Sequence, residues 1–183
     1  MGMLVTSISR VGQIEEEPKK YILLDNSIYW DDDGALYLVP RNYKSDGYTI
    51  PNWIAWLGGG KMEYDLRPAH FHDFICQYHA AIKISKVNLT TLRKRRFIRN
   101  HYNQDTHHWL TIAEDIPIKY LDYVHFTKWE ADCIFKRIMK STKTIPAWRV
   151  NLMRFGVFFN INWCRSGKKD YDFSKCYKVQ DDD

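Results

Sequence analysis

The hydrophobic pattern of the chain changes once along its length, and this change constrains the fold more than any other feature. Up to residue 40, short apolar runs alternate with turn residues. The runs are Tyr21–Leu24, Ser27–Trp30 and Ala35–Val39, and the turns are Asp25-Asn26 and Asp31–Gly34. Such runs are typical of antiparallel strands joined by tight turns. We therefore expect a three-stranded meander in this part of the chain.

The second half carries helix signals. Pro68 suits the first turn of a helix, and Thr127-Lys128-Trp129-Glu130 fits a capping box. The expected helices are Ala69–Ala80, Ala131–Lys140, one from Thr144-Ile145-Pro146 to about Gly156, and one between Lys86 and Leu110. Strands followed by helices predict an α+β fold, with a small antiparallel N-terminal meander packed against a helical C-terminal half.

The size and composition indicate one domain spanning residues 1–183, with 45% hydrophobic and 27% charged residues. No run approaches the roughly 20 apolar residues that a membrane helix needs. The segment Met1–Arg10 has no basic region followed by an apolar stretch, so we expect no membrane span and no secretory signal.

The charge is uneven, although the net charge is only +5. Between Ala81 and Gln104 there are seven basic residues and no acidic residue. The densest part is Arg93, Lys94, Arg95 and Arg96, followed by Arg99. This segment could bind the phosphates of a nucleic acid. Two alternatives are a solvated helix face and a patch that docks an acidic partner protein.

Four motifs together resemble one protein family. They are Leu38-Val39-Pro40 with Ser45-Asp46-Gly47-Tyr48-Thr49-Ile50-Pro51, then Pro68-Ala69-His70-Phe71-His72-Asp73-Phe74-Ile75-Cys76, Ala131-Asp132-Cys133-Ile134-Phe135, and Phe155-Gly156. This pattern, over roughly residues 36 to 160, is similar to the phage and prophage family of domain of unknown function thirteen fifty-three.

The resemblance implies a phage or prophage origin and a shared fold, and it implies no activity. It places the protein in the host cytoplasm or in the virion. The stretch from Cys76 to Asp132 is longer than the family pattern, so residues 83–125 are expected to be a basic insertion. The helix before Phe155-Gly156 also lacks the Met-Tyr pair of that pattern.

Histidine and aspartate residues border the core stripes of two expected helices. On a helical wheel, Phe71, Phe74, Ile75 and Tyr78 share one face, with His72 on one side and His70 and Asp73 on the other. Asp132 lies at the edge of the next apolar stripe and needs a partner if it is buried. The partner could be His70, His72, an arginine or a metal ion.

Two interpretations of these residues remain open. In the first, Asp46, His72 and Asp73 are catalytic, and His70, His72, Asp73 and Asp132 bind a divalent Zn²⁺, Mn²⁺ or Mg²⁺ that activates water for hydrolysis. In the second, Asp46 stabilises a turn, and His72, Asp73 and Asp132 form a buried hydrogen-bond network between helices.

Two catalytic arrangements are excluded by the pattern. A phosphohydrolase of the HD-domain type needs a histidine on an earlier helix, and no histidine precedes His70. A nucleophilic triad has no support, because Cys76 flanks the core stripe and no serine lies in a nucleophile elbow.

Two classes of function therefore stand. One is a phage accessory enzyme, a metal-dependent hydrolase built on His72 and Asp73. The other is a non-enzymatic phage protein, either a virion or tail component or an inhibitor of a host system. Its partners would be phage structural proteins or a host protein. Trp53 and Trp56, in the irregular Gly-rich stretch after Arg41, and the basic residues would then form the binding surface.

Overall fold

The computed structural model describes residues 3–4, 11–14, 17–45, 67–104, 108–113, 115–142 and 145–158. The strands are β1 (Met3–Leu4), β2 (Val11–Ile14), β3 (Glu17–Leu23), β4 (Ser27–Trp30), β5 (Leu36–Val39), β6 (Lys44–Ser45), β7 (Ala80–Ile84), β8 (Ile98–Asn103), β9 (His108–Ala113) and β10 (Asp122–His125). The helices are α2 (Arg67–Tyr78), α3 (Lys86–Lys94), the short 3-10 turn η1 (Ile118–Tyr120), α4 (Lys128–Thr142) and α5 (Ala147–Phe158). The predicted α+β class is confirmed.

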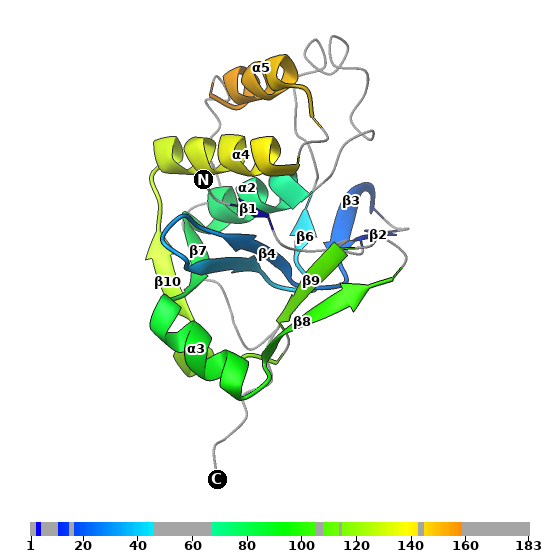
Figure 1. Cartoon of the computed structure of the whole chain (residues 1–183). Coiled ribbons are helices and arrows are strands. Elements are labelled where there is room, and N and C mark those ends of the chain that lie inside the picture. Colours follow the sequence, from blue (N-terminus) through cyan, green and yellow to red (C-terminus); the bar gives the residue numbers. More distant parts are fainter. Residues whose placement is uncertain are drawn as a thin grey trace.

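The strands form three antiparallel sheets. The largest has the order β1-β4-β5-β7-β10, the second has the order β2-β3-β6, and β8 and β9 form a separate two-stranded ribbon. The helices α2, α4 and α5 are stacked on one side of the large sheet, and α3 lies at the opposite end of the molecule (Figure 1). No helix in the described ranges is long and apolar enough to cross a membrane.

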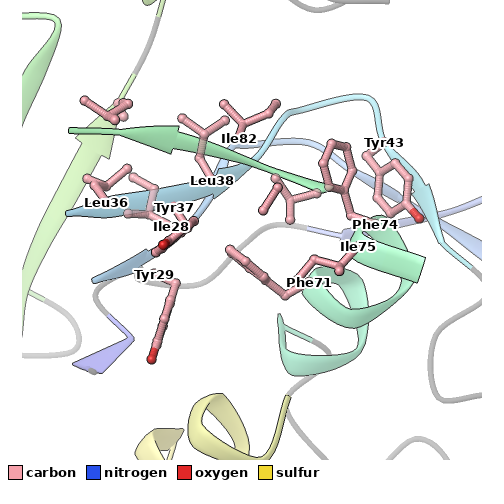
Figure 2. Packing of buried hydrophobic residues seen from close by; sticks show 14 of the residues in the cluster. Ile28, Tyr29, Leu36, Tyr37, Leu38, Tyr43, Phe71, Phe74, Ile75 and Ile82 are labelled. Atoms are coloured by element: carbon pink, nitrogen blue, oxygen red, sulfur yellow. The ribbon is translucent and has the colours of Figure 1, made fainter. Parts of the chain in front are cut away.

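The core lies between the large sheet and α2. Phe71, Phe74 and Ile75 of α2 are at most 1% exposed and point toward buried sheet residues such as Leu38 and Ile82 (Figure 2). Phe74 packs edge-on against Tyr43, with ring centroids 5.2 Å apart. A smaller cluster joins α2, α4 and α5 through Ala69, Phe135, Met139, Ile145, Val150 and Met153. This packing fixes the position of α2, which carries the predicted site residues.

Several local predictions are confirmed. The turn Asp31–Gly34 joins β4 to β5, and its Gly34 has a φ of 78°. The capping box is formed, because Glu130 accepts hydrogen bonds from the backbone and the hydroxyl of Thr127, both at 2.8 Å. These bonds lower the pKa of the Glu130 carboxyl. The helices expected after Pro68 and after Pro146 are also present.

The hairpin expected at Asp25-Asn26 is wrong. β3 pairs with β2 and β6, whereas β4 pairs with β1 and β5 in the other sheet. The side chain of Asn26 binds remote backbone instead of closing a turn: its amide donates to the carbonyl of Ala113 and its oxygen accepts from the backbone of Arg41. The chain therefore passes from one sheet to the other at this point.

A helix is present between Lys86 and Leu110, as expected, but it is short: α3 ends at Lys94 and the ribbon β8–β9 follows. The strand β7 was not predicted at all. It lies between β5 and β10 in the large sheet and directly follows α2. The residue between them, His79, has a φ of 52°, in the left-handed region. The expected insertion, residues 83–125, thus begins and ends in two neighbouring strands, β7 and β10. That it is an insertion stays a prediction.

Candidate functional site

The facing sides of α2 and α4 bring together two of the predicted site residues. Nε2 of His72 on α2 lies 3.4 Å from Oδ1 of Asp132 on α4. The other oxygen of Asp132 accepts a hydrogen bond from Nζ of Lys128 at 2.7 Å. Phe71 and Phe74 on the neighbouring face of α2 are buried in the core, which leaves His72 at the helix edge that faces α4. We call His72, Asp132 and Lys128 the interhelical triad.

Asp132 is almost completely buried, with 1% of its surface exposed. Burial by itself would raise the pKa of this carboxyl. Hydrogen bonds from His72 and Lys128, with the positive charge of Lys128, outweigh that effect, so the pKa of Asp132 lies below its ordinary value of 3.8. The carboxylate is therefore ionised and compensated at neutral pH. The prediction that Asp132 is buried and partnered is confirmed, with His72 as one of the partners.

Lys128 was missed by the sequence reasoning. It lies in the first turn of α4, where a positive charge opposes the helix dipole. Its distance of four residues from Asp132 is the signal that could have identified it, because residues at i and i+4 are neighbours on a helix surface. In the folded protein its ammonium group sits beside a carboxylate oxygen, the position that a divalent cation would take.

The ring of His72 also contacts Phe135 and Cys76. Its centroid lies 4.8 Å from that of Phe135. The sulfur of Cys76 lies 3.6 Å from Nδ1 and 3.5 Å from Nε2. A sulfur nearly equidistant from both nitrogens does not lie along the lone pair of either one, which a thiol–imidazole proton transfer would require. The contact is a packing contact between sulfur and a ring.

Asp73 makes a hydrogen bond to β6 and also lies near His72 of the interhelical triad. Its Oδ2 accepts a hydrogen bond from the hydroxyl of Ser45 on β6, and its Oδ1 is 4.0 Å from Nδ1 of His72. One turn along the helix, Gln77 accepts a hydrogen bond from the hydroxyl of Tyr43 at 3.2 Å. These two contacts attach the polar edge of α2 to β6 and the segment before it. The hydrogen bond of Asp73 therefore joins α2 to β6, whereas the contact of Asp132 joins α4 to α2.

The remaining predicted ligands do not complete a metal site in the described part of the chain. His70 is fully buried. Among the described residues, no three His, Cys, Asp or Glu side chains lie together in a way that could hold a metal ion. Asp46 follows Ser45 in the sequence and lies outside the described residues, as do Trp53 and Trp56.

A second set of residues that the sequence reasoning did not identify consists of exposed aromatic side chains and an arginine on α4 and α5. Trp129, Trp148 and Phe155 are 58%, 56% and 53% exposed. Trp148 and Phe155 are seven residues apart on α5 and therefore share a face of the helix. Arg154 stacks over Trp129 at 5.1 Å and links the two helices. We call Trp129, Trp148, Arg154 and Phe155 the aromatic face.

The predicted basic residues are exposed. Arg93 and Lys94 form the last turn of α3, Arg95 and Arg96 follow it, and Arg99 lies on β8. They lie at the end of the molecule opposite α5 (Figure 1). They are thus separate from His72 and Asp132, which lie on α2 and α4.

Comparisons of the chain with family models, with curated proteins and with solved structures find no match.

Proposed function

We propose that the chain acts by binding another protein and not by catalysis. The observation that carries this proposal is the state of Asp132. Both oxygens of this buried carboxylate are occupied, one by His72 and the other by Lys128. A metal ion bound there would have to displace a lysine ammonium at 2.7 Å. The interhelical triad therefore has a structural role: it stabilises the packing of α4 on α2.

The aromatic face supplies the contact surface. Exposed Trp and Phe side chains with arginine are the composition typical of the centres of protein–protein interfaces. In this chain the interhelical triad and the small core cluster fix the position of α4. Arg154 of α5 contacts Trp129 of α4 and so connects the two helices. A rigid support lowers the entropy lost when a partner binds. The proposed partner is a phage structural protein or a host protein.

The phage assignment rests on the family resemblance of the motifs around Asp46, His72, Asp132 and Phe155. On that basis the protein acts in the host cytoplasm or in the virion. Its role would be that of a virion or tail component or of an inhibitor of a host system.

A metal-dependent hydrolase is the second candidate, and two observations favour it. His72 and Asp132, two of its four predicted metal ligands, lie 3.4 Å apart. Ser45, which binds Asp73, directly precedes Asp46 in the sequence. For this function Lys128 would have to leave Asp132 when the metal binds.

Site-specific cross-linking tests the binding proposal. We expect the photo-reactive analogue p-benzoylphenylalanine at position Trp148, in host cells that produce the phage proteins, to capture one defined phage or host protein, identified by mass spectrometry. Val87 on α3 is the matched control, because it is 78% exposed and lies at the other end of the molecule. Equal adducts from both positions, or none from Trp148, would refute the aromatic face as the binding surface.

A further inference from the structure

Four consecutive basic residues are concentrated at the C-terminal end of α3, and nothing in the binding proposal uses them. They are Arg93, Lys94, Arg95 and Arg96, and all four are exposed. We call them the basic turn. Arg93 stacks over Trp30 at 5.2 Å. None of the four forms an ion pair with a residue in the described ranges.

The backbone holds the basic turn in a defined conformation. The carbonyl of Leu92 accepts from the backbone N–H of Phe97 at 3.0 Å, and the carbonyl of Arg93 accepts from that of Arg96 at 3.1 Å. This pair of bonds is a Schellman motif, in which the residue at the position of Arg96 is left-handed. Arg96 has a φ of 61°, at a position where glycine is the usual residue. A charged side chain is thus projected from a strained backbone position.

Folding stability does not account for this arrangement. The C-terminal end of a helix carries about half of a negative charge, which one or two basic residues satisfy. Here four positive charges follow one another, and the described residues from Ser85 to Gln104 contain no acidic side chain. Neighbouring like charges repel each other. The excess positive charge is therefore available to an anionic partner.

We propose that the basic turn binds the phosphate backbone of duplex nucleic acid without reading its sequence. Three of the four residues are arginine, whose planar guanidinium matches phosphate geometry in a bidentate manner. Single strands are usually bound by aromatic side chains that stack on bases. Phe97 and Trp30, which adjoin the basic turn, both pack against the core instead. This inference does not depend on the proposed protein contact, because it concerns the opposite end of the molecule.

Fluorescence anisotropy with a labelled DNA duplex of about 20 base pairs tests the proposal. We expect the whole protein to bind with a dissociation constant near micromolar at about 50 mM salt, and to bind much more weakly at about 200 mM salt. The variant Lys94→Gln/Arg95→Gln/Arg96→Gln should bind at least about tenfold more weakly. Its log–log salt slope should be shallower by about 2.7, because each lost phosphate contact contributes about 0.9.

Two further variants separate this surface from net charge and from folding. Lys44→Gln/Lys136→Gln/Lys140→Gln removes the same charge from β6 and α4, and its affinity should fall far less. Arg96→Gly relieves the left-handed backbone, so it should unfold at the same or a higher urea concentration while its affinity falls about threefold and its salt slope by about 0.9.

Three outcomes would overturn the proposal. The first is no binding of the duplex at low salt. The second is an equal loss of affinity in the two triple variants, which would make the effect one of net charge. The third is displacement of the duplex by polyglutamate at an equal concentration of charge, which would make an acidic protein the partner.

Discussion

Lys128→Met should lower the free energy of unfolding at pH 7 by about 3 kcal/mol. The substitution leaves Asp132, which is 1% exposed, with His72 as its remaining partner in the interhelical triad. An incompletely compensated buried carboxylate is costly, whereas the methionine side chain preserves most of the packing of the lysine stem. Urea unfolding monitored by circular dichroism measures the change.

The double variant Lys128→Met/Asp132→Leu is the control, since it removes the buried charge together with its partner. It should recover most of the loss, because a buried ion pair can often be replaced by apolar side chains at little cost. The pH dependence supplies a second check. The pKa of Asp132 is lowered in the folded state, so its contribution to stability is present above the ordinary value of 3.8 and is lost as the pH falls through the folded pKa. The difference between wild type and Lys128→Met should therefore shrink in acid. A double variant no more stable than the single one would contradict the structural role of the interhelical triad.

Phe74→Ala should have a larger effect, lowering the free energy of unfolding by about 4 kcal/mol. Phe74 is fully buried between α2 and the large sheet, where its ring contacts those of Tyr43 and Tyr78 at centroid distances of 5.2 and 4.8 Å. Removing the ring leaves a cavity in the layer that positions α2, and therefore His72 (Figure 2). Urea unfolding again gives the value.

Phe74→Leu is the matched control, because it keeps most of the apolar volume and should cost about 1.5 kcal/mol or less. If both variants lost the same small amount, α2 would not depend on this core contact. A loss confined to Phe74→Ala would show that α2 is held by packing, with the polar contacts of Asp73 and His72 adding orientation.

The sequence predicts those elements whose signals are local. The turn before Gly34 and the capping box at Thr127 and Glu130 depend on residues within a few positions of one another. The prediction of a hairpin at Asp25-Asn26 is wrong because the side chain of Asn26 donates a hydrogen bond to Ala113, 87 positions away. A partner so distant in the sequence cannot be recognised from the residues around the turn. Ala80–Ile84 follows a helix without a break, and only the left-handed backbone at His79 separates the two elements.

The candidate site was predictable to a similar extent. The helical wheel places His72 and Asp132 at the borders of apolar stripes, which is why a buried carboxylate with a histidine partner could be expected. It does not give the direction in which Asp73 points, because its partner Ser45 comes from a strand of the first half. The spacing of Lys128 from Asp132 is a local signal, but a lysine in the first turn of a helix opposes the helix dipole and is not an expected partner there.

Metal content is the most direct test of the claim that the interhelical triad has a structural role and is not a metal centre. Inductively coupled plasma mass spectrometry would be applied to protein purified without chelator, with His72→Ala as the control. We expect no stoichiometric zinc or manganese in either protein, and a lower urea midpoint for His72→Ala because Asp132 loses one partner. Near-stoichiometric metal that disappears in His72→Ala while the fold is retained would contradict the binding proposal and establish the hydrolase site as the better account.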